Sequence, residues 1–427
     1  MALLLATNDR LESGAALAGI CGMLYGIVLF LRNGGGQITA AGLFGLGFAV
    51  FVAGASMYWV SEGGVRDLTF VLVQVVPLVA MWLMDLLFWR KLEPVRAQVR
   101  LDPRVFKVVG SVTIAVVIVL LGLMLLSGNT AIRRITAGAV VLLLILLFLP
   151  GEGRRSSTVT LVLAAGVSVM FFEVFFNGFG RLVLVAIVLS VLVALSGQIR
   201  SPGLKPLLIV ATVPAIYALA SIREGVETAS GEELDGLGSV VNPFYTMVEL
   251  ANFLSSFRVA EIELNSFAAV FLFWVPRSMW EEKPVGFGRE LVLLLRPELS
   301  HTNHSMAALF TGEWVYAFGL IGLILMVITL GWGVAAIDRL IHWSVSRSVL
   351  GFRAFFVLVS ASFVAGQVPT LVWSGLFSPT SRSLQGFVAI AIISISSWLI
   401  ASAFSARGTA ADSLGKAKPS VTNGLRY

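Results

Sequence analysis

The chain has few charged residues for its length. Charged side chains make up 13% of its 427 residues, whereas soluble globular domains carry about 25%. Hydrophobic residues make up 57%, and the mean hydropathy is +0.92. This imbalance excludes a soluble globular protein and predicts a chain that crosses a membrane several times. The apolar runs are continuous over about 20 residues and do not alternate, so we expect α-helices and not a β-barrel.

Cysteine and histidine are nearly absent. The single cysteine, Cys21, lies in an apolar run, which excludes disulfides within the chain and metal sites built from cysteines.

The start, MALLLATNDRLESG, lacks a basic segment followed by a cleavage site, so we expect no cleavable signal peptide. The net charge of +6 comes from basic residues in loops beside apolar runs, where membrane topology explains them. We therefore expect no nucleic-acid partner.

Eleven apolar runs are long enough to predict transmembrane helices. The loops assigned to the cytoplasm contain 18 Lys and Arg residues and the short outer loops contain six. This bias predicts an outer N-terminus and a cytoplasmic C-terminus, with Arg133 and Arg134 as exceptions in an outer loop. The predicted spans are residues 14–31, 38–60, 68–89, 105–127, 135–150, 157–176, 181–197, 206–222, 312–337, 353–373 and 383–404.

The predicted spans divide this all-α integral membrane protein into four parts. Residues 1–222 form a transmembrane bundle of about eight helices, and 223–304 form one large extracytoplasmic loop. Residues 305–404 form about three more helices, and 405–427 form a cytoplasmic tail that we expect to be disordered. The loop holds 12 of the 24 acidic residues. It is too long to be a passive connector, so we expect it to fold over the membrane surface.

Three segments of this loop have distinct patterns. Residues 223–239 are polar and glycine-rich, and we expect them to be mobile. Asn242 and Pro243 form an N-cap and first-turn pair, which predicts the start of a helix that lies in the membrane interface. Residues 267–275 are apolar but too short to span, which indicates a re-entrant or interfacial segment. The apolar face of the predicted interfacial helix contains Phe244, Met247, Val248, Ala251 and Leu254.

Polar residues crowd into one stretch between two apolar runs, WVPRSMWEEKPVGFGRELVLLLRPELSHTNHSMAALFTGEWVYAFG (274–319). Ionisable groups are costly at a membrane boundary, so such a cluster predicts a functional site. Arg277 lies between two tryptophans, a residue type enriched at the lipid headgroup level, and its guanidinium is suited to binding a diphosphate. The alternative is an interfacial anchor on ordinary lipid phosphates. Lys283 precedes a Pro-Gly turn whose backbone N–H groups are suited to binding an anion. The alternative is a lysine in a solvated loop.

Two histidines and one glutamate complete the candidate site. His301 and His304 share a face only if their segment is helical. They lack companions for a metal site, so acid–base or hydrogen-bonding use is favoured, with interfacial structural histidines as the alternative. Glu313 precedes an apolar run and should lie at the outer mouth of its span, where it either acts as a base or stabilises the start of the helix.

The run PRSMWEEKPVGFG, a histidine-containing segment and the following GEWVYAFGLIG resemble the Wzy-type O-antigen polymerases, which join oligosaccharide repeat units. Ten residues separate Arg277 from Gly288, as in an Arg-x10-Gly pattern described in such polymerases. The similarity covers roughly residues 274–322, and the multi-span layout with one large outer loop fits as well. O-antigen ligases share this layout and belong to the same wider group.

This resemblance implies a glycosyltransferase with a GT-C-like helical fold in the bacterial inner (cytoplasmic) membrane, with its active site facing the periplasm. It implies no metal, nucleotide sugar or other cofactor. The donor would be a glycan on undecaprenyl diphosphate, and the acceptor another lipid-linked repeat unit. The product would be the O-antigen of lipopolysaccharide or a related surface polysaccharide. A chain-length regulator is a further candidate partner beside the lipid bilayer.

The chemistry of the residues assigns roles within such a reaction. Arg277 and Lys283 would stabilise the leaving diphosphate. Either Glu313 or His304 would deprotonate the acceptor hydroxyl. Glu313 is favoured, because a histidine near a diphosphate stays protonated and then binds phosphate better than it accepts a proton. The predicted catalytic residues are Glu313, His304 and Arg277, and the predicted substrate-binding residues are Arg277, Lys283, His301, Arg289, Arg258 and Arg223.

Two other functions fit parts of the sequence. A ligase or related transferase would use the same donor and deliver the glycan to lipid A core or to a protein, and the sequence does not distinguish these acceptors. A transporter of lipid-linked glycans would keep ionisable groups near the middle of the membrane and show inverted repeats. Charges are nearly absent from the middle of the predicted spans and gather at one face. This distribution favours chemistry at the membrane surface.

Overall fold

The computed structural model describes residues 2–65, 67–90, 99–127, 130–149, 165–166, 168–169, 181–198, 203–224, 236–257, 264–272, 275, 278–283, 286–301 and 304–416. Within these residues, eight helical segments are long and apolar enough to cross a membrane, which confirms the predicted all-α membrane class. They are Arg10–Arg32, Ala40–Ser61, Leu68–Trp89, Pro103–Leu126, Ala131–Phe148, Leu309–Val345, Phe352–Ser374 and Phe377–Phe404.

Each of these eight segments coincides with a predicted span. Two further predicted spans correspond to shorter apolar helices, Leu182–Ser196 and Leu204–Ala218. The predicted span 157–176 lies almost wholly outside the described residues.

The helices and strands follow one another along the chain with several interruptions. The first half contains α1 (Ala2–Arg32), α2 (Ala40–Phe48), the π-helix η1 (Ala49–Gly54), α3 (Ala55–Ser61), α4 (Leu68–Met84), the π-helix η2 (Asp85–Trp89), β1 (Arg100–Leu101), α5 (Pro103–Ser127), α6 (Thr130–Phe148), α8 (Arg181–Ser196) and α9 (Leu204–Glu224). The second half contains α10 (Gly236–Phe257), α11 (Leu264–Phe271), α12 (Phe287–Leu295), the 3-10 helix η3 (Pro297–Leu299), α13 (Leu309–Val345), β2 (Val349–Leu350), α14 (Phe352–Gly366), α15 (Val368–Ser374) and α16 (Phe377–Lys416).

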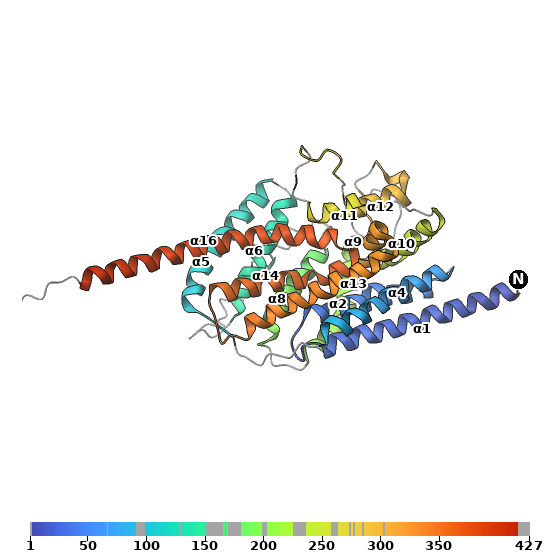
Figure 1. The fold of residues 1–427 in the computed structure, drawn as a ribbon, viewed down its shortest axis with the longest axis horizontal. Helices are drawn as coiled ribbons and strands as arrows, with labels where there is room; N and C mark the ends of the chain where they lie inside the picture. Colours follow the sequence, from blue (N-terminus) through green and yellow to red (C-terminus); the bar gives the residue numbers. More distant parts are fainter. Residues whose placement is uncertain are drawn as a thin grey trace, which may run out of the picture.

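The bundle is elongated (Figure 1), and α2 lies in its interior. All nine residues of α2 are buried. Small residues let α1 and α2 approach closely: a β-carbon on Gly26 would lie 2.5 Å from the Gly45 carbonyl oxygen, and one on Gly45 would lie 2.7 Å from the Gly26 carbonyl oxygen. Membrane helices commonly associate through such contacts between small residues.

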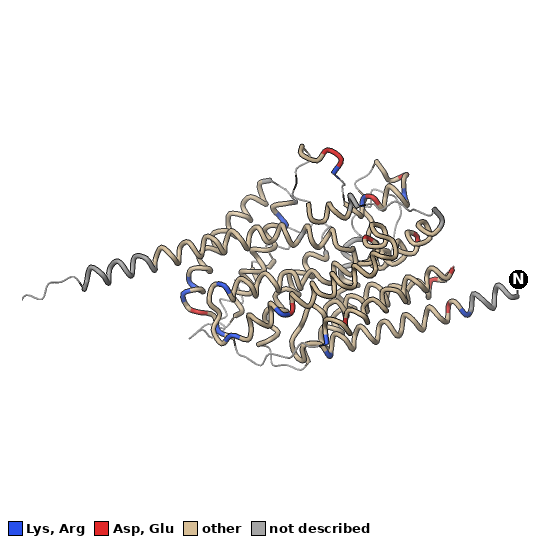
Figure 2. The backbone as a smooth tube through the Cα atoms, in the orientation of Figure 1, with Lys and Arg blue, Asp and Glu red and all other residues tan. Residues whose placement is uncertain are grey.

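The two ends of the bundle carry different charge patterns. Figure 2 shows Lys and Arg gathered at the end where α1 ends and α5 begins, and acidic and basic residues mixed at the opposite end over α10 and α12. The strands β1 and β2 form a short parallel pair that joins two loops, both predicted to be cytoplasmic. We call the end with this pair the inner end and the opposite one the outer end.

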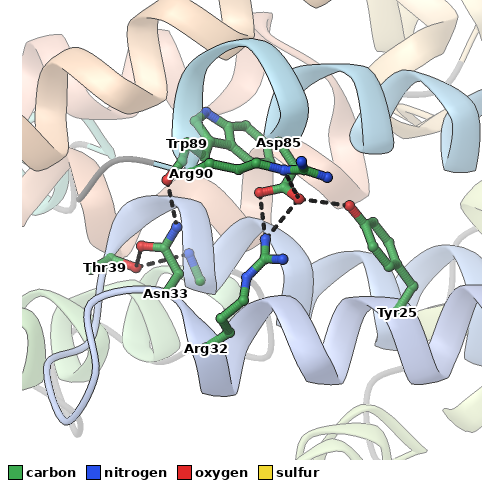
Figure 3. A network of polar contacts seen from close by, with 8 residues as sticks. Tyr25, Arg32, Asn33, Thr39, Asp85, Trp89 and Arg90 are labelled. Carbon is green, nitrogen blue, oxygen red and sulfur yellow. Dashed lines mark hydrogen bonds and ion pairs between the residues drawn. The ribbon is translucent and has the colours of Figure 1, made fainter. Parts of the chain in front are cut away.

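A buried carboxylate joins α1 to η2 at the inner end. Asp85 is fully buried, and its oxygens accept hydrogen bonds from Arg32 at 2.7 Å and from the Tyr25 hydroxyl at 2.8 Å (Figure 3). The Arg90 guanidinium lies 3.9 Å away. Asp85 therefore lies at the opposite end of the bundle from α12.

The turn between α1 and α2 is fixed by a cation at one helix end and an anion at the other. The Lys205 amine donates to the carbonyls of Leu31 and Asn33, near the end of α1. Buried Asp338 accepts hydrogen bonds from the backbone N–H groups of Ala40 at 2.6 Å and Ala41 at 3.0 Å, at the start of α2. Both placements match the sign of the helix dipole, so these groups serve to hold helix ends.

The start predicted for the interfacial helix is wrong. Helix α10 begins at Gly236, and Pro243 lies inside it. Proline removes a helical hydrogen bond, but carbonyls beside it find indole partners: Trp373 Nε1 donates to Val240 at 2.8 Å and Trp59 Nε1 donates to Val241 at 3.4 Å. Phe244, Met247 and Val248 of the predicted apolar face are buried. Helix α10 packs against α3, α4, α9 and α13, so this face contacts the bundle.

Two other predicted boundaries differ from the structure. The predicted continuous span 312–337 is broken at Gly319, whose backbone angles (φ 59°, ψ −144°) are not helical. Glu313 therefore lies in a short helix that precedes the break. The expectation of a disordered tail after Ala406 is wrong up to Lys416, because α16 continues to that residue.

Candidate functional site

The outer end contains most of the residues that the sequence singled out. Glu313 is 3% exposed, in the short first part of α13. Its Oε1 and Oε2 accept the backbone N–H of Phe377 at 2.9 and 3.1 Å, and Oε2 also accepts the N–H of Leu376. Glu313 thus stabilises a helix start, namely that of α16, which is a neighbouring helix and not its own. Its predicted use as a base is untested, and neither of its oxygens is open.

Close backbone packing surrounds this carboxylate. Gly375 has a φ of 83°, and a β-carbon there would lie 2.9 Å from Glu313 Cδ. Gly286 has a φ of 113°, and a β-carbon there would lie 2.5 Å from the ring of Phe377. Only glycine combines these backbone angles with such small separations. The junction of α12, α13 and α16 is therefore built around Glu313.

The glycine of the Arg-x10-Gly pattern has a packing role. A β-carbon on Gly288 would lie 2.4 Å from the Met306 carbonyl oxygen and 2.4 Å from Ser305 Oγ. The Met306 N–H donates to the Gly288 carbonyl at 2.9 Å. Gly288 therefore allows the segment after the histidines to lie directly on the start of α12.

Arg289 and Lys283 both donate to backbone carbonyls. The Arg289 guanidinium donates to Leu299 at 3.3 Å, to His304 at 3.4 Å and to Ser300. Lys283 Nζ donates to Val275 at 2.7 Å. Arg289 thus fixes the segment 299–304 against α12, and this segment carries both candidate histidines.

The histidines do not share a helix face. His301 lies in a turn and is exposed, and His304 begins an extended segment. The condition for a common face, a helix through both residues, is not met. Among the described residues, no group of three or more His, Cys, Asp and Glu side chains is arranged to hold a metal ion.

Three predicted arginines are not placed in detail. Arg277 and Arg258 lie outside the described residues, and Arg223 lies in the last turn of α9. Their predicted contacts with substrate remain predictions.

A cavity of about 370 Å³ opens at the outer end between α4, α10 and α12. The sequence analysis did not identify it, because its walls come from three distant segments. The signals present were the N-cap residue before α4 and the polar side of α10. The cavity is lined by Gly64, Asp67, Phe70, Tyr245, Val248, Glu249, Asn252, Phe253, Leu294, Leu295 and Arg296.

The polar groups of this cavity are held by one another. Glu249 Oε1 accepts a hydrogen bond from the Arg296 guanidinium at 2.7 Å. Asp67 caps α4 by accepting the Phe70 N–H at 3.1 Å, and its second oxygen accepts the Asn252 amide at 2.9 Å. Among the described residues of this lining, two carboxylates and one guanidinium leave one negative charge in excess.

Comparisons with protein-family models, with curated proteins and with solved structures found no match to this chain. The functional argument therefore rests on the sequence pattern and the geometry of the outer end.

Proposed function

We propose that the protein is a membrane glycosyltransferase that polymerises undecaprenyl-diphosphate-linked oligosaccharide repeat units at the outer face of the membrane. The observation that carries the proposal is the cavity at the outer end, which has aromatic and polar walls in an otherwise apolar bundle. Ligand sites in proteins are commonly concave and largely apolar, with a few placed polar groups. The segment that resembles the polymerases contributes α12 to this cavity.

The polar groups within the described spans favour surface chemistry over transport. Asp85 and Asp338 lie near the inner end, and their oxygens are bound to an arginine, a tyrosine and backbone N–H groups. Glu313 is bound to the start of α16 at the outer end. A transporter is expected to carry its ionisable site near the middle of the membrane. These three acids instead serve to hold helix ends and helix contacts.

Within the proposed reaction, Arg277 and Lys283 stabilise the diphosphate that leaves from the donor sugar. Arg289 positions the segment that carries His301 and His304, of which His304 assists diphosphate binding. The acceptor is a second lipid-linked repeat unit. No metal or nucleotide sugar takes part.

The glycan profile of a deletion strain tests this proposal. We expect loss of the long-chain polymer ladder with single repeat units retained, and recovery of the ladder by the wild-type gene. Arg277→Ala should abolish recovery at an unchanged protein level. Arg277→Lys should lower the polymer about tenfold or more, because an ammonium group lacks the bidentate fork and loses at least one charge-assisted hydrogen bond.

Loss of all transferred glycan in the deletion strain, single units included, would contradict polymerisation and identify a ligase. An unchanged ladder would contradict both functions. Full recovery by Arg277→Ala would reduce this arginine to an interfacial anchor.

A further inference from the structure

The chemistry of the outer cavity limits what it binds. Its negative charge excess disfavours an anionic diphosphate at this position. The Asn252 amide, the Glu249 carboxylate and the Arg296 guanidinium supply both donors and acceptors, and the partly exposed Tyr245 and Phe253 supply ring surfaces. Hydroxyl groups of a sugar pair with such donors and acceptors, while the C–H face of a sugar ring packs on aromatic rings. A neutral saccharide is therefore the ligand class that this lining fits.

The walls of the cavity are held firmly. The Tyr245 ring lies against Trp59, with ring centroids 4.8 Å apart. Arg296 donates to the Leu295 carbonyl at 2.9 Å as well as to Glu249. Side chains fixed in this way lose little further freedom when a ligand binds, which favours affinity.

Glu249 is distinguished from the other two acids of the outer end. Both oxygens of Asp67 accept hydrogen bonds, as do both oxygens of Glu313. Glu249 Oε1 is held by Arg296, whereas no hydrogen bond to its Oε2 is found among the described residues. The Glu249 side chain is 24% exposed and lines the cavity, so a ligand there can contact it.

Helix α12 runs from Arg289, which positions the segment that carries His301 and His304, to this cavity. Arg289 lies in its first turn, and Arg296 follows its last residue. Seven residues of helix separate the two α-carbons by roughly 10 Å. A donor diphosphate near the start of α12 and a neutral sugar at its end would then lie close enough to react without sharing a binding site.

From these contacts we infer that the cavity binds the acceptor sugar and that Glu249 deprotonates the attacking hydroxyl, an inference that rests on the proposed function. The hydroxyl proton moves to Glu249 Oε2 as the hydroxyl oxygen forms a bond to the anomeric carbon of the donor. The bond between this carbon and the phosphate oxygen breaks, and its electron pair leaves with the lipid diphosphate. Glu249 then releases the proton to water. Arg296 is a positioning residue that keeps Oε1 occupied and directs Oε2 into the cavity.

Turnover of purified variants with lipid-diphosphate-linked repeat units tests this inference. Glu249→Gln should lower turnover about 100-fold or more, as expected for loss of a general base, with donor binding and thermal stability unchanged. Glu249→Asp should retain partial turnover, because a shorter carboxylate still accepts a proton. Glu298→Gln is the matched control: Glu298 is exposed, lies two residues after Arg296 and does not line the cavity. It should turn over like the wild type.

If the wild type turns over and the rate of Glu249→Gln lies within about threefold of the wild-type rate, the role of Glu249 is overturned. Absence of wild-type turnover would instead contradict the proposed function, and a binding measurement then decides the cavity separately. Its probe is the free oligosaccharide of one repeat unit, without lipid or phosphate, titrated by calorimetry. Wild-type binding that Asn252→Ala weakens about tenfold supports a saccharide site, whereas absence of wild-type binding overturns it.

Discussion

At the scale of single residues, the outer end contains two glutamates with opposite surroundings. Glu313 is buried and accepts backbone N–H groups with both oxygens, while Glu249 faces a cavity with one oxygen open. The sequence favoured Glu313 as the base because a histidine near a diphosphate stays protonated. Its actual contacts give it the role of an N-cap for α16, supplied from another helix.

Replacement of Glu313 by Gln should destabilise the protein. A Gln side chain has one acceptor oxygen, whereas Glu313 uses two. The NH₂ group of Gln would therefore face a backbone N–H from which it cannot accept a hydrogen bond. We expect a loss of about 1–3 kcal/mol, the range for charge-assisted hydrogen bonds and helix caps, seen as a lower midpoint of thermal unfolding in detergent. Glu62→Gln, at an exposed carboxylate after α3, should leave the midpoint unchanged. An unchanged midpoint for Glu313→Gln combined with lost turnover would restore Glu313 as the base.

At the scale of helices, hydrophobic pattern predicted where spans lie but not how they start or break. A helix of about 20 apolar residues matches the thickness of the hydrocarbon core of the membrane. Ten of the predicted spans accordingly coincide with apolar helices. The Asn242-Pro243 pair predicted a helix start, yet α10 begins earlier, and indoles from α3 and α15 donate to the carbonyls of Val241 and Val240 beside Pro243. Such partners are distant in sequence and leave no local signal.

The break in α13 is the clearest departure from a simple span. Gly319 has open space around the position of a β-carbon, so any cost of Gly319→Ala comes from its backbone angles alone. We expect a loss of about 1–3 kcal/mol in the free energy of unfolding. Gly333→Ala is the control in the same helix: it also has open space but helical angles, and should be neutral or stabilising by up to about 1 kcal/mol. Equal stability of the two variants would mean that α13 is not broken at Gly319.

At the scale of the whole molecule, the predicted all-α membrane class is confirmed, whereas the predicted site remains a prediction. The polar stretch lies at the end of the bundle that carries the cavity. Glu249 and Arg296 are 47 residues apart, and their pairing depends on how α10 and α12 pack. Asp338 reaches the start of α2 across 298 residues. Contacts of this separation are set by tertiary packing, which the pattern of a single sequence does not record.

The most direct test of the central claim is polymer formation by the purified protein in vesicles. The substrate is a lipid-diphosphate-linked repeat unit, supplied alone, without a nucleotide sugar. We expect lipid-linked products that lengthen by one repeat unit at a time, with one lipid diphosphate released for each new bond. Substrate that crosses the bilayer without new glycosidic bonds, or bonds formed only after a different acceptor is added, would contradict the claim.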